Sequence, residues 1–127
     1  MSRSKPLIAI VDDDESVCRA IRRLFQSVSM DAETFQSGGD FLELLDAMPS
    51  FQPDCLILDV QMPGINGLDL QKSLTQRGNR VPVVFISAHD EIGVREQALQ
   101  IGAIGFLRKP FDDELLLKTV NQVLRLN

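Results

Sequence analysis

The 127-residue sequence is poor in several features that mark particular classes of protein. It has only two cysteines, Cys18 and Cys55, both among apolar residues, which argues against a disulfide-stapled scaffold and predicts two small core residues in a reducing compartment. Residues 1–6 are polar and lack the apolar stretch of a signal peptide, and no apolar run approaches the ~18 residues that span a bilayer. These absences predict a soluble cytoplasmic protein that does not enter a membrane.

Basic charge is also scarce, with 13 Lys and Arg against 18 Asp and Glu and a net charge of −5. Because Lys and Arg contacts with phosphates supply most non-specific affinity for nucleic acid, the chain is predicted not to bind nucleic acid directly. No glycine-rich signature of a dinucleotide or P-loop site follows a strand, and Gly38-Gly39 is interpreted as a turn before a helix. The single histidine, His89, has no metal-ligand partner at suitable spacing and is interpreted as a loop residue.

Two kinds of segment alternate along the chain. Short segments rich in apolar or β-branched residues predict strands at 7–11, 31–35, 55–58, 83–86 and 104–107. Most of these are continuously apolar, which is typical of parallel strands buried on both faces, whereas 31–35 is more polar and suits the edge of a sheet. Apolar residues at helical spacing separate the strands.

Start and stop signals flank these helical patterns. Candidate N-cap residues precede them, and Pro49, Gly78 and Gly102 follow three of them. The candidate caps are Asp14, Ser37, Asn66, Asp90 and Asp112. Five strand–helix repeats with right-handed crossovers predict an α/β fold: a single doubly wound, five-stranded parallel sheet in the flavodoxin-like order 2-1-3-4-5, with helices on both faces. Residues 1–127 are expected to form one domain.

Polar residues follow four of the predicted strands. Asp12-Asp13 comes after 7–11, Asp59 after 55–58, Ser87 after 83–86 and Lys109 after 104–107. The carboxyl ends of parallel strands share one edge of the sheet, so these side chains are expected to converge. Three close carboxylates need either protonation or a hard divalent cation such as Mg²⁺. A carboxylate beside a cation, an ammonium and a hydroxyl suits phosphoryl transfer, in which Asp can act as the nucleophile.

Four segments together resemble the receiver domain of two-component response regulators. They are 10–13, 58–64 with Gly67, 86–88 and 109–111, and the resemblance extends from Leu7 to about Leu124. Within that family, 87–90 and 108–111 look most similar to the nitrogen-fixation type of transcriptional regulator.

The resemblance implies a role for each matching residue. Asp59 is the expected phosphoacceptor, and Mg²⁺, or Mn²⁺ in its place, is expected to be held by Asp13, Asp59 and the backbone carbonyl of Gln61, with Asp12 acting through water. Lys109 is expected to contact the aspartate at rest and a phosphoryl oxygen afterwards.

The same resemblance implies a switch. Ser87 is expected to move toward the phosphoryl group, and Phe106, which lacks the tyrosine hydroxyl of many relatives, to rotate inward. The Lys109–Pro110 bond is expected to be cis. The fourth helix, fifth strand and fifth helix would then form the switched face, where the run Leu115–Leu117 cannot be buried entirely by one helix.

Implied partners are a sensor histidine kinase and an output domain or downstream protein, most simply one that controls transcription, and a phosphorylation-dependent homodimer. The chain is expected to be a phosphorylation substrate that assists its own phosphotransfer and dephosphorylation, rather than an enzyme. It is either a stand-alone receiver or part of a longer regulator.

Two alternatives remain at this level. Asp12-x-Asp14-x-Ser16 loosely matches the start of haloacid-dehalogenase-type phosphatases, although their second metal-binding acidic pair is not evident and Asp59 precedes Met62-Pro63-Gly64 instead. A pseudo-receiver that only binds a partner is the other alternative, which the intact acidic and lysine set disfavours.

Overall fold

Strands and helices alternate in the computed structural model, which describes residues 5–88 and 93–125. The strands are β1 (Leu7–Val11), β2 (Asp31–Phe35), β3 (Cys55–Asp59), β4 (Val83–Ser87) and β5 (Gly105–Arg108). The helices are α1 (Glu15–Ser27), α2 (Gly38–Ala47), α3 (Gly67–Gln76), α4 (Val94–Gln100) and α5 (Asp113–Arg125). Within the described ranges, every helix is too short or too polar to cross a bilayer.

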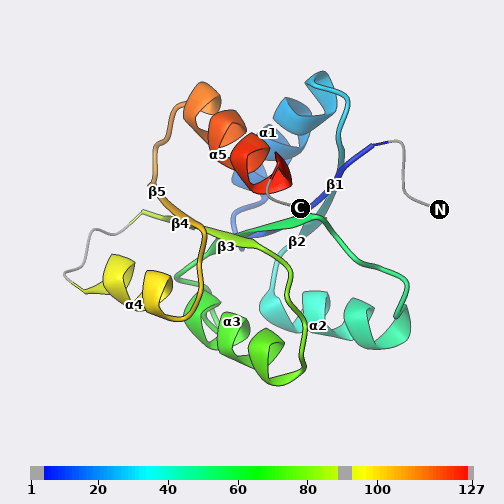
Figure 1. The fold of residues 1–127 in the computed structure, drawn as a ribbon, viewed down its shortest axis with the longest axis vertical. Coiled ribbons are helices and arrows are strands. Elements are labelled where there is room, and N and C mark those ends of the chain that lie inside the picture. The colour runs from blue at the N-terminus through cyan, green and yellow to red at the C-terminus, as the bar shows by residue number, and fades with distance from the viewer. Residues whose placement is uncertain (1–4, 89–92, 126–127) are drawn as a thin grey trace.

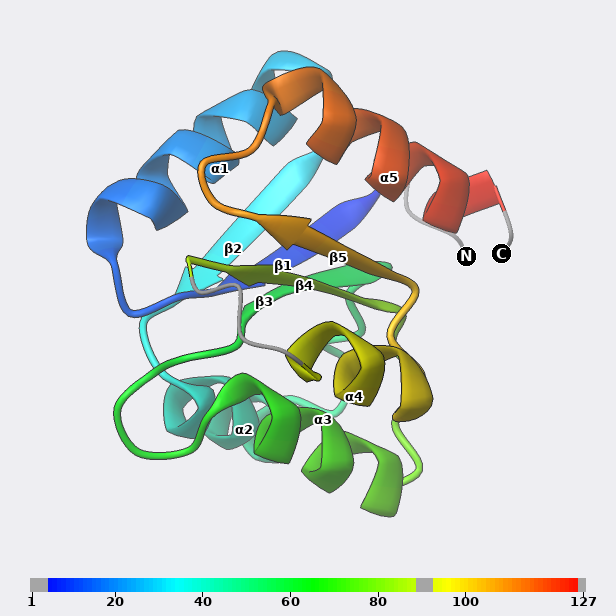
Figure 2. The same cartoon turned by 90° about the vertical axis from the view of Figure 1, so that its left-hand side faces the viewer.

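The five strands form one parallel sheet in the order β2-β1-β3-β4-β5. Helices α1 and α5 cover one face, and α2, α3 and α4 cover the other (Figures 1 and 2). The predicted doubly wound fold is therefore confirmed, with the polar strand β2 at an edge.

Both faces of the sheet are buried, as the continuous apolar strands predict. Along β1, Ile8 and Ile10 join the core under α1 and α5, whereas Ala9 and Val11 join the core on the opposite face. All four are fully buried, so successive residues of the strand face two separate apolar layers.

The strand ends differ slightly from the predicted ones in a way that matters for the site. β3 and β4 each extend by one residue, so that Asp59 and Ser87 belong to the sheet and pair with Ile86 and Arg108. β5 begins one residue later than predicted and leaves Ile104 before it, 44% exposed. The side chains of Asp59 and Ser87 therefore project from backbone that the strand ladder fixes.

Side-chain capping sets the start of four helices. Asp14, Ser37 and Asn66 accept backbone N–H groups at the starts of α1, α2 and α3, and Asp112 accepts that of Glu114 in α5. Helix α4 differs: it follows Gly93, which has φ 90° and provides no side-chain cap. The predicted cap of this helix, Asp90, lies outside the described residues, as does His89.

The predicted stop signals are also in place. Gly78 and Gly102 follow α3 and α4 with φ of +75° and +99°, the left-handed conformation that ends helices and that glycine adopts without strain. Of the leucine run in α5, Leu116 is fully buried, Leu117 is partly buried and Leu115 is 47% exposed.

Candidate functional site

Three carboxylates meet at the carboxyl edge of the sheet. Asp12 and Asp13 follow β1, Asp59 ends β3, and one carboxylate oxygen of each lies within 4.8 Å of the others. Asp12 is fully buried and Asp59 is 5% exposed, whereas Asp13 is exposed. Burying two charges here requires compensation, since an ionised carboxylate is stable in an apolar interior only when it is paired.

Lys109 supplies part of that compensation. Its ammonium Nζ lies 2.7 Å from Oδ2 of Asp12 and 3.7 Å from Oδ1 of Asp59. Its backbone N–H donates to the carbonyl of Ser87 at 2.7 Å, which ties the end of β5 to the end of β4. The Lys109–Pro110 peptide bond is cis, the form that the resemblance implies.

Asp12 is also held by backbone and thiol groups. The backbone N–H of Asp14 donates to Oδ1 of Asp12 at 2.9 Å, and the Cys18 thiol donates to the Asp12 carbonyl at 3.2 Å. Burial raises the pKa of this thiol to about 11, so Cys18 stays protonated and acts as a donor. The sequence predicted that Cys18 lies in the core, and this is confirmed. Nothing in the sequence pattern indicated that its thiol contacts an acidic residue of the site.

The loop after β3 is held close to the strand that carries Asp59. The N–H of Val60 donates to the carbonyl of Ile86 at 3.0 Å, and that of Gly67 donates to the carbonyl of Val60 at 2.8 Å. A Cβ at residue 67 would collide with the carbonyl oxygen of Asp59. Glycine is needed here because α3 begins directly against the phosphoacceptor candidate.

The electrostatics of the cluster leave it short of positive charge. Burial first, and then the charges of Asp12 and Asp13, raise the pKa of Asp59 to about 7, although Lys109 works in the opposite direction. Burial lowers the pKa of Lys109, but its hydrogen bond with Asp12 and the charges of Asp59 and Asp12 outweigh this, so that its pKa is raised overall. Among the described residues, the Lys109 ammonium therefore contacts two of the three carboxylates, those of Asp12 and Asp59.

The donor set fits a hard divalent cation. Carboxylate oxygens are the ligands that Mg²⁺ prefers, and Mg²⁺ is commonly held by one or two of them, with water and phosphate oxygens completing its shell. Asp12, Asp13 and Asp59 provide three oxygens within reach of one another. A bound cation would favour the ionised form of Asp59 and so lower its raised pKa. Gln61 is exposed, two residues beyond Asp59.

The two predicted switch residues lie on neighbouring strands. Ser87 is 1% exposed at the end of β4, one residue beyond the partner of Asp59 in the strand ladder. Phe106 is half-buried in β5, and the Arg95 guanidinium of α4 lies 5.4 Å from its ring centre. Arg95 also donates to the carbonyl of Phe106 at 3.4 Å, so this aromatic residue contacts α4 through both its ring and its backbone.

Comparison with known proteins assigns these features to one family. Residues 8–121 match the model of the response regulator receiver domain. The chain belongs to this family. The match favours the receiver interpretation over the phosphatase alternative, and relates the chain to two-component signalling and to transcriptional regulators.

Individual relatives agree with the family match. The transcriptional regulatory protein TdiR of Thauera aromatica is 41% identical over 120 residues, which are 94% of this chain and 52% of TdiR. The response regulator protein TodT of Pseudomonas putida is 38% identical over 126 residues, which are 99% of this chain and 54% of TodT. This chain thus spans about half the length of these relatives.

A solved structure extends the likeness to the fold. A response regulator receiver protein from Burkholderia phymatum is 57% identical, with a TM-score of 0.86 over 95% of this chain and 96% of that one. The finer expectation of a nitrogen-fixation-type regulator stays a prediction.

Proposed function

We propose that this receiver domain accepts a phosphoryl group on Asp59 from the phosphohistidine of a sensor histidine kinase. The observation that carries the proposal is the placement of a nearly buried Asp59 with its Oδ1 3.7 Å from the Lys109 ammonium and within 4.8 Å of two further carboxylates. An isolated surface aspartate lacks such surroundings, which suit a reaction catalysed by positioning and charge neutralisation.

In the proposed reaction, a carboxylate oxygen of Asp59 attacks phosphorus. The bond between phosphorus and the kinase imidazole nitrogen breaks, and that nitrogen takes a proton as it leaves. Lys109 neutralises charge beside the acceptor, and Ser87 donates a hydrogen bond to the new phosphoryl group. The same surroundings, with water as the nucleophile, would support the later loss of the group.

Mg²⁺, or Mn²⁺ in its place, would be held by Asp13, Asp59 and the backbone carbonyl of Gln61, with Asp12 acting through water, and would neutralise the approaching phosphoryl oxygens. This assignment is supported by the three oxygens that lie within reach of one another. Asp12 is the least exposed of the carboxylates, and its Oδ2 is the one paired with Lys109, which suits an indirect role.

The new charge of about −1.5 to −2 would then bias a two-state switch. Ser87 moves toward the phosphoryl group, and Phe106 rotates into the space beside it, which changes its contacts with Arg95 and so the position of α4. The face formed by α4, β5 and α5 exposes Leu99 and Leu115 by 49% and 47%. This face is proposed to bind an output domain or downstream protein and to form a phosphorylation-dependent homodimer.

In this proposal, residues 1–127 act as one receiver unit in the cytoplasm, and the unit controls transcription through its partner without touching nucleic acid or membrane itself. Its net charge of −5 supports the absence of direct contact with nucleic acid.

The decisive test is labelling of the protein by a phosphorylated kinase or a small phosphodonor, followed by intact mass. A Mg²⁺-dependent gain of one phosphoryl group is expected in the wild type, and loss of that gain in Asp59→Asn. Unchanged labelling in Asp59→Asn would remove Asp59 from the proposal. Light scattering with a beryllium fluoride mimic tests dimerisation, and an unchanged monomer mass would contradict it.

A further inference from the structure

An apolar groove of about 420 Å³ lies between the first half of α1 and the segment that joins β5 to α5, which run beside each other in Figure 2. One wall is formed by Val17, Ala20 and Ile21, and the other by Pro110 and Phe111, with Asp113 as the acidic residue of the lining. Its volume is within the ~300–1,000 Å³ of small-molecule sites, which are mostly apolar with a few placed polar groups.

The groove and the acidic cluster share one residue, Lys109. Lys109 lines the groove, and its ammonium is the group that lies 2.7 Å from Asp12 and 3.7 Å from Asp59. Ala88, which directly follows Ser87 and so the end of β4, lines the groove as well. Lys109 therefore connects the groove to the carboxylate that would accept the phosphoryl group.

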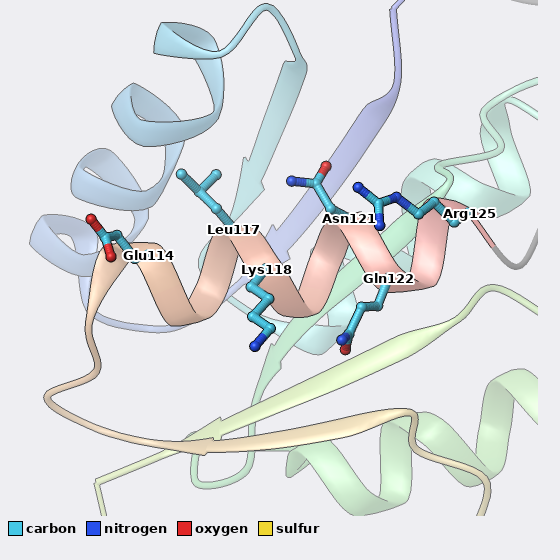
Figure 3. A pocket seen from close by; sticks show the side chains of 6 residues that line it. All are labelled: Glu114, Leu117, Lys118, Asn121, Gln122 and Arg125. Atoms are coloured by element: carbon cyan, nitrogen blue, oxygen red, sulfur yellow. The ribbon is translucent and has the colours of Figure 1, made fainter.

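A second hollow, of about 360 Å³, is lined by none of the residues that line the groove. Its described lining comes from one helix, α5, and all of the lining residues except Leu117 are polar or charged (Figure 3). Among the described residues, this hollow takes its side chains from a single helix. Of these two hollows, the groove beside Lys109 has the apolar walls and the positive charge that suit an apolar ligand with an anionic group.

We propose that this groove is the leaving-group subsite for small acyl phosphates, and that it favours an apolar acyl chain of several carbons over acetyl. The proposal rests on the proposed function, since Asp59 must be the phosphoacceptor. A carboxylate oxygen of Asp59 attacks phosphorus, the bond between phosphorus and the acyl oxygen breaks, and the electron pair leaves with the released carboxylate anion. No proton or redox partner is required.

The chemistry of the groove supports this ligand class. Transfer of the methylene groups of an acyl chain from water to the apolar walls is favourable. Lys109 attracts both the phosphate of the donor and the carboxylate that is released. In a closed pocket one methylene changes the specificity constant by roughly 10–200-fold, and this groove is open to solvent on one side, so a smaller gain per carbon is expected.

The test compares hexanoyl phosphate with acetyl phosphate as donors for the full chain in the same Mg²⁺ buffer. Initial labelling rates are followed by intact mass and corrected for the spontaneous hydrolysis of each donor. The wild type is expected to have a second-order rate constant roughly tenfold higher with hexanoyl phosphate. Ala20→Gln, which puts a polar side chain into the groove, should lower the hexanoyl phosphate rate constant and so bring the ratio of the two rate constants close to one. Ala47→Gln, at an exposed residue of α2, is the matched control and should keep the wild-type ratio.

A second measurement does not depend on variants. Hexylphosphonate is expected to inhibit acetyl phosphate labelling at a concentration roughly tenfold lower than methylphosphonate, for the same reason. Equal labelling by the two donors, equal inhibition by the two phosphonates, or a ratio unaffected by Ala20→Gln would overturn the groove proposal while leaving Asp59 as the phosphoacceptor. Folded protein that neither donor labels would contradict the proposed function itself.

Discussion

Lys109 lies closer to Asp12 than to Asp59: its ammonium is 2.7 Å from Oδ2 of Asp12 and 3.7 Å from Oδ1 of Asp59. The lysine thus pairs mainly with the fully buried carboxylate, and the phosphoacceptor candidate keeps only a longer contact. This arrangement has consequences for stability, metal binding and pH dependence that can be measured separately.

Removing the lysine should expose the repulsion between the carboxylates. Breaking one side of a buried pair costs about 3–5 kcal/mol, and the Lys109 side chain is 18% exposed, so Lys109→Met is expected to lose about 2–4 kcal/mol of unfolding free energy without Mg²⁺. Added Mg²⁺ should restore more stability to this variant than to the wild type, because the cation replaces the lost charge.

Urea unfolding followed by circular dichroism measures this effect, since the chain has no tryptophan or tyrosine. Lys118→Met, at an exposed residue of α5, is the control and should change stability by less than ~0.5 kcal/mol. Equal gains from Mg²⁺ in Lys109→Met and the wild type would refute the explanation.

Variants of Asp12 and Asp13 should distinguish the contribution of the cluster to stability from its contribution to metal binding. Asp13→Asn is expected to weaken Mg²⁺ binding by roughly tenfold or more with little change in the stability of the metal-free protein, because Asp13 is exposed. Asp12→Asn should weaken binding and also destabilise the metal-free protein, because Asp12 is buried against Lys109. Titration calorimetry and thermal unfolding measure the two effects, and identical behaviour of the two variants would count against this division.

The raised pKa of Asp59 predicts a specific pH dependence of the metal-free protein. In the folded state the pKa of Asp59 is about 7, against 3.8 for an unperturbed Asp. Between these two pH values the folded protein therefore binds more protons than the unfolded protein does. Stability should therefore rise as the pH falls from about 7.5 toward 5. The contribution is the reverse of the usual one for a salt-bridged Asp, whose pKa is lowered.

Asp59→Asn should remove this contribution and raise the melting temperature most at pH 7.5. Thermal unfolding at several pH values gives the difference between variant and wild type, which cancels the titration of other groups. Asp31→Asn, at the exposed start of β2 and so at the opposite end of the strands, is the control. A difference that stays constant with pH would show that Asp59 does not titrate in this range.

Two glycines offer a matched test of the close approach between α3 and β3. Gly67→Ala puts a Cβ against the Asp59 carbonyl and is expected to cost about 1–3 kcal/mol and to slow phosphorylation by displacing Asp59. Gly39→Ala in the first turn of α2 meets only Ser37 Oγ, at 3.9 Å, and should be neutral or stabilise by up to about 1 kcal/mol. Chemical unfolding measures both, and a tolerated Gly67→Ala would contradict the packing described.

Much of the fold could be predicted because its signals are local. The continuous apolar run 7–11 coincides with β1, and Asp14, Ser37, Asn66 and Asp112 cap the helices that their positions predict. The convergence of Asp12, Asp13, Asp59 and Lys109 followed from the rule that parallel strands share a carboxyl edge.

What could not be predicted depends on contacts distant in sequence. Gln71 is polar yet only 7% exposed in α3, and its amide donates to the carbonyl of Ile101, thirty residues away, while its Oε1 has no partner in the described part of the chain. Nothing in the sequence pattern near Gln71 indicates that burial. The thiol contact of Cys18 with Asp12 likewise follows only from how α1 lies on the sheet.

The uncapped start of α4 gives the domain an uneven resistance to deformation. Displacing the first turn of α1, α2, α3 or α5 would break a side-chain capping hydrogen bond, whereas in the described part of the chain the seven-residue α4 follows a glycine and has no such bond to lose. A glycine in place of a capping side chain costs only about a few tenths of a kcal/mol. Arg95, which holds the ring and carbonyl of Phe106, belongs to that same turn. In the described part of the chain, the first turn of the helix that contacts Phe106 is thus held by one side-chain hydrogen bond fewer than the first turns of the other four helices.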